Sequence, residues 1–418
     1  MSRFTQKIST QFLGTAIRVV TLALFLVVFG TGVALAQTKG YVSNSDDNTV
    51  SVIDTSTNTV TATIPVGLRP QGLAVTPNGA FVYVANEFGN SVSVISAANN
   101  TVVGTIPVSG PATVAITPDG AFAYVTTIPD SVSVIDTATN TVVATVPVGS
   151  NPIGIAITPN GAFAYVTNLF DSSVSVIDTA TNAVVATIPV GIAPFSIAIA
   201  PNGAFAYVTA ALDVQITVID TATNTVSDTI PFVGSIAIDI TPNGAFAYVA
   251  NSLKISAIDL ATNTVTATVP APTFLFPFDV SITPDGASVY VSQDNSNQVA
   301  VFDTATNTFT ATIPVGASPS FIAFAKAQTP QDQIAALIAQ VEALIAGGTL
   351  TQNQGDGLID KLNQVVAKLD ADQTGAACNQ MSAFISQVQA FINSGALTQA
   401  QGQSLIDAAN AVRTNLGC

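Results

Sequence analysis

The stretch Ile155–Val190 decides the fold, and it reads IAITPNGAFAYVTNLFDSSVSVIDTATNAVVATIPV. Four short segments of it have the composition of β-strands: Ile155–Thr158, Ala162–Thr167, Val174–Ile177 and Ala183–Val190. In the third segment apolar and small residues alternate with a period of two, as in a half-buried strand. A Pro-Asn-Gly turn follows the first segment, because Pro fixes φ and Gly tolerates left-handed backbone. Four short strands with turns between them predict an antiparallel meander sheet.

This unit recurs along the chain. Each of the seven tyrosines is followed by Val, and neighbouring tyrosines are 41 or 42 residues apart. A period near 41 residues is the length of one four-stranded blade of a β-propeller. The tyrosines are Tyr41, Tyr83, Tyr124, Tyr165, Tyr207, Tyr248 and Tyr290.

The number of turns predicts how the ring closes. There are seven Tyr-Val strands but only six Pro-Asn-Gly or Pro-Asp-Gly turns, at Pro77, Pro118, Pro159, Pro201, Pro242 and Pro284. The first repeat begins at its second strand, and Pro319–Phe324 supplies one further innermost strand after the seventh repeat. We therefore predict an all-β, seven-bladed propeller over residues 37–327, in which this last strand completes the first blade. Such closure removes the open sheet edges that a linear array would expose.

The remaining residues, 328–418, change to a helical period. Apolar residues from Ile334 to Ile345 form one stripe, and the same pattern returns 47 residues later from Met381 to Ile392. A second pair of stripes, Leu358–Leu369 and Leu405–Leu416, follows the same spacing. Glycines end the first helix of each pair, and capping boxes beginning at Thr residues start the second. We predict a small all-α domain built from two tandem helical hairpins.

The only two cysteines, Cys378 and Cys418, fall in this helical domain. They stand at the start of the predicted third helix and at the end of the fourth, and those ends meet in an antiparallel pair. A disulfide is the natural interpretation for an exported chain. The alternative is a reactive thiol pair or half of a metal site.

Residues 1–36 have the pattern of a secretory signal peptide. Three basic residues precede a nearly continuous apolar run, Val19–Ala36, that ends in the small-x-small sequence Ala34-Leu35-Ala36. An uncleaved anchor helix is the alternative, but it would span about 20 apolar residues without such a cleavage site. We therefore expect a secreted, cell-surface or periplasmic protein with no transmembrane segment after cleavage.

Composition narrows the chemistry that the chain can perform. It contains no His, so Ser-His-Asp and Cys-His catalysis and His-ligated metals are excluded. Without the leader, 7 Lys and Arg stand against 25 Asp and Glu, which gives a net charge of −18. A surface of this charge repels phosphate backbones, which argues against nucleic-acid partners.

The blade sequence resembles the YVTN family of β-propeller repeats over about residues 38–325. The match is direct at Tyr41–Asn44, Tyr83–Asn86, Tyr165–Asn168 and Tyr248–Asn251, whereas Thr127, Ala210 and Gln293 replace the terminal Asn in the other repeats. The resemblance implies a seven-bladed propeller on an exported or surface-layer-type protein, and no single activity. Some relatives bind DNA and related propellers are sugar lactonases, but no catalytic residue of that family maps to a position in this sequence. The helical tail resembles the FIMAH type of module, which implies no mechanism.

Carboxylates after the second strand of several blades are the candidate ligand site. Asp residues recur three positions beyond the Tyr-Val-x-Asn endpoint, and in a propeller the loops that carry them gather around the mouth of the channel. They could hold Ca²⁺ or a cationic ligand, since hard cations prefer oxygen ligands; ordinary solvated hairpin turns are the alternative. The candidates are Asp47, Glu87, Asp130, Asp171, Asp213 and Asp294.

Two other sets of residues have simpler explanations. Aspartates such as Asp178 open the turn after the third strand, where an Asp side chain accepts backbone N–H bonds. Phe274, Phe276 and Phe278 lie in the irregular segment Pro270–Asp279, where they could line a ligand face or act as a structural plug.

Two functions remain. We favour a non-enzymatic, exported binding or scaffold protein that contacts a protein or envelope component and needs no cofactor. The alternative is a lactonase-like, metal-dependent hydrolase that uses the carboxylates at the channel mouth.

Overall fold

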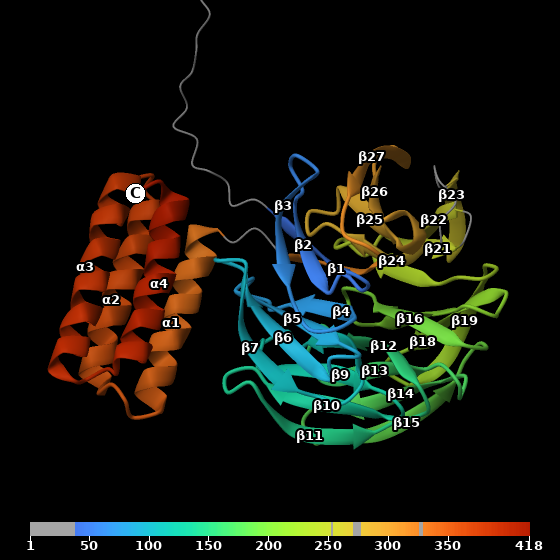
Figure 1. Ribbon diagram of the computed structural model, residues 1–418, viewed down its shortest axis with the longest axis horizontal. Helices are drawn as coiled ribbons and strands as arrows, with labels where there is room; N and C mark the ends of the chain where they lie inside the picture. The colour runs from blue at the N-terminus through green and yellow to red at the C-terminus, as the bar shows by residue number, and fades with distance from the viewer. Residues whose placement is uncertain (1–37, 252–253, 271–276, 326–328) are drawn as a thin grey trace, which may run out of the picture. The chain divides into compact units, whose positions relative to one another are not determined.

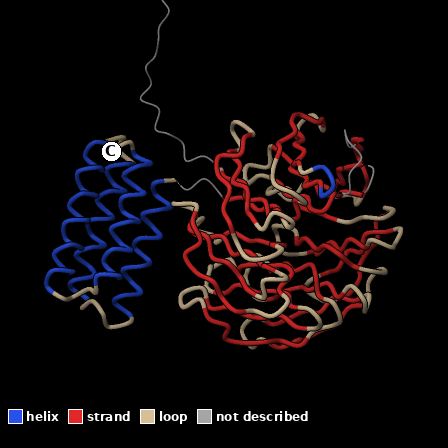
Figure 2. Tube along the Cα trace, in the orientation of Figure 1, coloured by secondary structure: helices blue, strands red, loops and turns tan. Residues whose placement is uncertain are grey.

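The computed structural model describes residues 38–251, 254–270, 277–325 and 329–418. The predicted signal peptide, residues 1–36, lies outside these ranges. The described strands form seven four-stranded sheets that follow one another around a ring (Figure 1). The four α-helices of the described residues all follow the last strand, and one short 3₁₀ helix lies among the strands (Figure 2). The predicted fold class, a seven-bladed β-propeller followed by helices, is confirmed.

Blade 1 contains the sheet β28-β1-β2-β3, and blades 2 to 7 contain β4–β7 through β24–β27 in chain order. The innermost strands are β28 (Pro319–Ala325), β4 (Pro70–Val75), β8 (Pro111–Ile116), β12 (Pro152–Ile157), β16 (Pro194–Ile199), β20 (Ala237–Ile240) and β24 (Pro277–Ile282). The second strands are β1 (Lys39–Asn44), β5 (Phe81–Asn86), β9 (Phe122–Thr127), β13 (Phe163–Asn168), β17 (Phe205–Ala210), β21 (Phe246–Asn251) and β25 (Ser288–Gln293). The third strands are β2 (Thr49–Asp54), β6 (Ser91–Ser96), β10 (Ser131–Asp136), β14 (Ser173–Asp178), β18 (Gln215–Asp220), β22 (Lys254–Asp259) and β26 (Gln298–Asp303). The outermost strands are β3 (Thr59–Pro65), β7 (Thr101–Pro107), β11 (Thr141–Pro147), β15 (Ala183–Pro189), β19 (Thr225–Pro231), β23 (Thr264–Pro270) and β27 (Thr308–Pro314).

The ring closes as the turn count predicts. Strand β28 pairs antiparallel with β1, and the register places Lys39 opposite Ala325 and Val42 opposite Ile322. Strands from the two ends of the repeat region therefore share one sheet. The pairing extends beyond the two strands, because the backbone N–H of Ser45, in the loop after β1, donates to the carbonyl oxygen of Ser318 at 2.9 Å.

The second strand of each blade packs between neighbouring sheets. Tyr165 of blade 4, for example, is fully buried in a cluster that also contains Ile197 and Val208 of blade 5. Such a position favours a large side chain whose polar end finds a partner, which Tyr provides.

Six of the seven tyrosine hydroxyls bind a turn in the following blade. In five junctions the hydroxyl donates to an Asn Oδ1 at distances from 2.5 to 3.5 Å, and Tyr290 does the same to Asn58. The Asn belongs to the turn between the third and fourth strands and has left-handed backbone, with φ between 52° and 54°. Asn is one of the few residues besides Gly that adopt this conformation readily. These six bonds link neighbouring blades in a repeating way that the sequence analysis did not foresee.

The junction between blades 1 and 2 is the exception. Neither the Tyr41 hydroxyl nor Asn100 Oδ1, which occupy the equivalent positions, has a hydrogen-bond partner among the described residues, although both atoms are buried. The Lys39 Nζ instead donates to the carbonyl oxygen of Ala97 in that turn, at 3.0 Å.

The four helices are α1 (Pro330–Ala346), α2 (Gln352–Leu369), α3 (Thr374–Ser394) and α4 (Gln399–Leu416). They share one apolar core that includes Leu337, Leu358, Phe384 and Leu405. The predicted capping boxes are present at Thr351 and at the equivalent Thr of α4. None of the described helices is long and apolar enough to cross a membrane.

Both helical hairpins of the bundle contain the same close contact between a glycine and an isoleucine. A Cβ atom at Gly355 in α2 would lie 2.1 Å from Ile345 Cδ1, and one at Gly402 in α4 would lie 2.2 Å from Ile392 Cγ1. Both glycines are therefore needed for the close approach of paired helices, in spite of their low helix propensity.

Deletion of Ser320–Ala325 should unfold the whole propeller rather than remove one strand, because blade 1 would lose its innermost strand and the ring its closure. The measurement is thermal unfolding followed by near-UV circular dichroism of the tyrosines, all of which lie between residues 41 and 290. Deletion of residues 330–418 is the control and should leave this signal in place. An unchanged unfolding midpoint in the Ser320–Ala325 deletion would contradict the closure.

Asn182→Gly should destabilise the propeller by about 1 kcal/mol, because it removes the nearer acceptor of the Tyr124 hydroxyl, 2.7 Å away, and leaves the Thr179 carbonyl oxygen at 3.3 Å. Gly keeps the left-handed turn without strain. Asn100→Gly is the matched control: it changes the same turn position where the tyrosine bond is absent, so we expect a smaller loss. Urea unfolding compares the two variants, and equal losses would show that the tyrosine bond contributes nothing.

Candidate functional site

Two kinds of loop meet on one face of the propeller. Because the strands alternate in direction, the loop between the second and third strands and the connector between blades emerge at the same end of each sheet. We call this surface the loop face. It comprises residues 45–48, 66–69, 87–90, 108–110, 128–130, 148–151, 169–172, 190–193, 211–214, 232–236, 294–297 and 315–318 among those described.

All six carboxylates singled out in the sequence lie on the loop face, and three of them bind the adjacent connector. Asp47 Oδ2 accepts the backbone N–H of Ala317 at 2.6 Å, and Asp171 Oδ2 accepts that of Ser150 at 2.7 Å. Asp213 Oδ2 accepts the N–H of Ile192 at 3.2 Å. In each case the donor directly follows a connector glycine. These carboxylates fasten one blade's loop to the connector that enters the blade.

The other three carboxylate residues, Glu87, Asp130 and Asp294, make contacts that differ from one another. Glu87 Oε2 lies 3.1 Å from Arg69 Nε and 3.3 Å from Gln71 Nε2. Asp130 binds the N–H of Val148 through its backbone carbonyl oxygen, and Asp294 begins the short 3₁₀ helix η1 (Asp294–Ser296).

The structure does not bring these carboxylates together. Across the described residues, no three Asp, Glu or Cys side chains lie close enough to hold one metal ion. Calcium binding at the loop face stays a prediction of the sequence. The geometry instead agrees with the turn interpretation of Asp47, Asp171 and Asp213.

Apolar side chains are the prominent feature of the loop face. Among the described residues, seven large apolar side chains are 58–76% exposed, and every one of them lies on this face. The seven are Leu68, Phe88, Phe170, Ile192, Leu212, Val214 and Val233.

Five of these side chains, from Phe170 to Val233, follow one another across blades 4, 5 and 6. Backbone hydrogen bonds join the loops that carry them: Val190 N to Ser172 O at 3.0 Å, Ala211 N to Ala193 O at 3.0 Å and Phe232 N to Val214 O at 2.8 Å. We call Phe170, Ile192, Leu212, Val214 and Val233 the apolar patch.

A second feature, which the sequence analysis missed, lies on the innermost strands. Asp239 in β20 and Asp279 in β24 are partly buried carboxylates on the innermost strands of blades 6 and 7. Burial raises the pKa of Asp239 to about 6. Burial, with the nearby charge of Asp239, raises the pKa of Asp279 to about 7. The signal in the sequence was Ile238-Asp239-Ile240, where the corresponding segments of most other blades have a small residue between apolar ones.

Three phenylalanines from different blades meet beside this pair of carboxylates. Phe278 makes edge-to-face contacts with Phe195 of blade 5 and Phe321 of blade 1, with ring centroids 5.7 and 5.3 Å away. These contacts agree with the plug alternative for the cluster, which stays a prediction, and we call the three rings the phenylalanine plug; Phe274 and Phe276 lie outside the described residues.

Comparison with known proteins agrees with this architecture. The family model described as "Lactonase, 7-bladed beta-propeller" matches residues 55–183 and 178–312. The chain belongs to this lactonase-type propeller family. A FIMAH domain model matches residues 334–414, so the helical bundle is a FIMAH domain. No curated protein matches the chain.

Solved structures similar to this family member share its fold. Hydrazine synthase of Kuenenia stuttgartiensis is 24% identical with a TM-score of 0.55, covering 60% of this chain and 88% of its own. A functionally unknown protein from Desulfotomaculum acetoxidans is 20% identical with a TM-score of 0.62, covering 68% and 98%. Dihydro-heme d1 dehydrogenase NirN is 16% identical with a TM-score of 0.53, covering 69% and 75%. At these identities the similarity concerns the fold alone.

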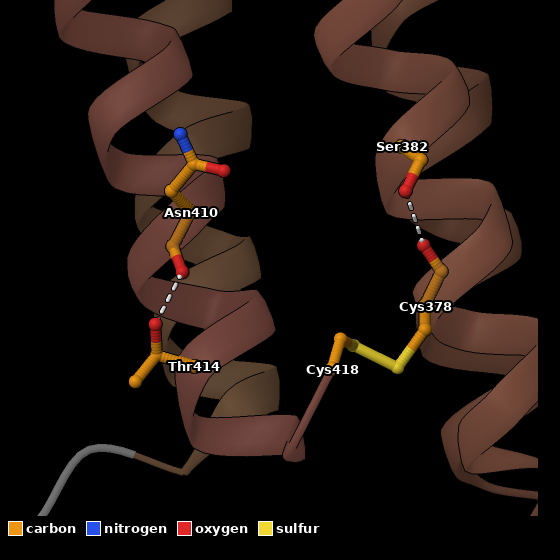
Figure 3. The surroundings of a disulfide bond; sticks show 5 residues. All are labelled: Cys378, Ser382, Asn410, Thr414 and Cys418. Carbon is orange, nitrogen blue, oxygen red and sulfur yellow. Dashed lines mark hydrogen bonds between the residues drawn. A yellow bond between two sulfur atoms is a disulfide. The ribbon is translucent and has the colours of Figure 1, made fainter.

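The FIMAH domain contains the disulfide between Cys378 and Cys418 (Figure 3). Cys378 lies one turn inside α3 rather than at its first residue, and Cys418 directly follows Gly417 at the end of α4. The Cα atoms are 5.9 Å apart. The bond thus joins the open end of the second helical hairpin.

Replacing both cysteines by Ser should destabilise the FIMAH domain by up to roughly 4 kcal/mol, because the bond closes a loop with a sequence separation of 40 residues. Denaturant unfolding followed by far-UV circular dichroism measures the loss in helix stability. The near-UV tyrosine signal of the propeller is the internal control and should not change. Two free thiols in the unreduced wild-type protein, found by mass spectrometry, would contradict the bond.

Proposed function

We propose that this lactonase-family propeller is an exported, non-enzymatic binding or scaffold protein that presents its loop face to an apolar surface of a protein or envelope component. The observation that carries the proposal is the concentration of the seven most exposed large apolar side chains on this one face. Scattered apolar residues are ordinary on protein surfaces, but a contiguous group marks an interaction site.

The energetics of the apolar patch favour association. Its five side chains are at least 59% exposed, so a partner that covers them removes apolar area from water. Each Å² of apolar area so buried contributes about 25 cal/mol before the entropic cost of association. The backbone bonds between the loops hold the loop backbones in place before binding, which lowers that cost.

The charges of the loop face are almost all negative, since seven carboxylates stand against one Arg. Asp47, Asp171 and Asp213 are occupied by connector N–H groups. The one basic residue of these loops is Arg69, which pairs with Glu87 and lies 4.6 Å from the ring centroid of Phe88. A face with a single, paired cation offers little to a phosphate backbone, which supports the expectation of no nucleic-acid partner.

A lactonase-like hydrolase is the second candidate, and the family match is the observation that favours it. Its metal-dependent form would use carboxylates at the channel mouth, but those carboxylates are apart and three of them bind backbone amides. The pair that does come together, Asp239 and Asp279, lies beside the phenylalanine plug. We therefore place binding ahead of hydrolysis.

The double variant Phe170→Ser, Leu212→Ser should reduce binding to the envelope fraction of the producing organism at least several-fold, because it removes two of the most exposed side chains of the patch. Co-sedimentation of the purified protein with that fraction measures the binding. Val143→Ser, Val185→Ser is the control, since it changes two apolar side chains on the outermost strands that are also more than half exposed, at 53% and 54%.

Two results would contradict the proposal. One is undiminished binding of the Phe170→Ser, Leu212→Ser variant. The other is turnover of a panel of lactones by the wild-type protein in the presence of divalent cations, with loss of turnover after chelation, which would favour the hydrolase.

A further inference from the structure

Asp239 and Asp279 connect three consecutive blades at the place where the ring closes. Asp239 Oδ2, on β20 of blade 6, accepts the backbone N–H of Ile282 on β24 of blade 7 at 2.8 Å. Asp279 Oδ2, on β24, accepts the backbone N–H of Ile322 on β28 of blade 1 at 2.9 Å. The two carboxyl groups therefore bind the free inner edges of successive strands, and the second of these strands closes the ring.

The bonds made by Asp239 and Asp279 do not recur in the other blades. The position of Asp239, opposite the repeated tyrosine, is Ala in five other blades and Ser281 in blade 7. The position of Asp279 is occupied by residues without a carboxylate in every other blade. The general packing of the ring therefore does not need either carboxyl group, and blades 6 and 7 alone have acquired one.

Further contacts make β28 depend on β24. Ser281 Oγ donates to the carbonyl oxygen of Ile322 at 2.8 Å, so both polar groups of Ile322 bind β24. Phe278 and Phe321 are in edge-to-face contact at the same junction. The carboxyl group of Asp279 thus lies at the centre of the contact between the closing strand and blade 7.

Within the described strands packed against the pair, no side chain carries a positive charge. The elements packed against β20 and β24 are β16, β17, β21, β25 and β28. Their titratable residues are the tyrosines Tyr207, Tyr248 and Tyr290, whose pKa values burial raises, so they are neutral below pH 10. Two ionised carboxylates would therefore repel each other across β24 without a counter-charge.

We propose that Asp239 and Asp279 form a proton-operated latch, which holds β24 and β28 firmly while the carboxyl groups are neutral and loosens the closing strand when both are ionised. For an exported protein, the latch makes ring stability depend on the pH outside the cell.

The direction of the pH effect follows from the raised pKa values. An unfolded chain loses both protons near the ordinary Asp value of 3.8, whereas the folded chain retains them up to about pH 6 and 7. Between these limits the folded state binds more protons than the unfolded state, so its stability falls as the pH rises. Carboxylates with lowered pKa values, such as Asp178 and Asp303, act in the opposite direction at lower pH, which sets the useful window above pH 5.

The test is thermal unfolding of the full chain at pH 5 to 8, followed by the near-UV signal of the tyrosines. The wild-type midpoint should fall by at least about 4 °C across this range. Asp239→Asn and Asp279→Asn should each reduce the fall, and the double variant should abolish it, because an amide has no charge to titrate. The amide oxygen can still accept the N–H bond from the neighbouring strand, whereas the bond from Ile240 N–H to Asp239 Oδ1, 2.8 Å long, is lost at every pH. Asp259→Asn, at a half-buried turn carboxylate of blade 6, is the control, and its midpoint should change with pH as that of the wild type does.

Hydrogen exchange gives a second measurement that does not depend on the variants. After correction for the intrinsic pH dependence of exchange, the Ile322 amide should lose protection between pH 5 and pH 8 more than amides of β12 do. A wild-type midpoint that stays constant or rises with pH would overturn the latch, and so would an unchanged fall in the double variant.

Discussion

The ladder between β1 and β28 joins the first and the last strands of the repeat region, and the burial of every blade depends on it. Each sheet packs against a neighbour on both faces, so an open ring would expose one face of blade 1 and one of blade 7. Because the two strands are far apart in sequence, their pairing carries a large loop-closure cost before any contact is gained. Extra bonds at this junction are therefore more valuable than the same bonds between blades that are adjacent in the chain.

The hydrogen bonds between blades differ at the two junctions that flank blade 1. Six junctions have a tyrosine–asparagine bond, and the junction between blades 1 and 2 lacks it. That junction lies beside the closure, where Lys39 binds the neighbouring turn instead. On the other side of the closure, Asp279 and Ser281 fasten β28 to blade 7. The two flanks of blade 1 thus depart from the common scheme in different ways.

The fold was predictable because the period is strict and the turns are chemically explicit. Seven tyrosines and six proline turns sufficed to predict the closure by β28, and the 47-residue shift predicted the paired helices. The contacts of the candidate site were harder to predict from the sequence. Asp171 was expected at the channel mouth with other carboxylates, but its oxygen binds Ser150 of a connector that precedes it by 21 residues. Such a partner follows from the packing of a connector against a loop, which sequence spacing does not encode. Asp239 was recognisable as a carboxylate between two isoleucines, but its partner Ile282 belongs to the next blade.

Several departures from the repeat lie on blades 4 to 7 and on β28, and these carry the functional argument, although the junction between blades 1 and 2 and the exposed Leu68 and Phe88 also differ from the repeat. The innermost strand β20 has only four residues, and the connector before it contains the exposed Val233. The apolar patch, the phenylalanine plug and both buried carboxylates lie on blades 4 to 7 or on β28 beside them. Blades 2 and 3 keep small residues at the positions of Asp239 and Asp279. A repeat that folds well by itself has no structural need for such changes on one side, whereas selection for binding acts on whichever loops and strands meet the partner. The asymmetry therefore points to blades 4 to 7 as the part of the propeller that contacts other molecules, with the remaining blades as its support.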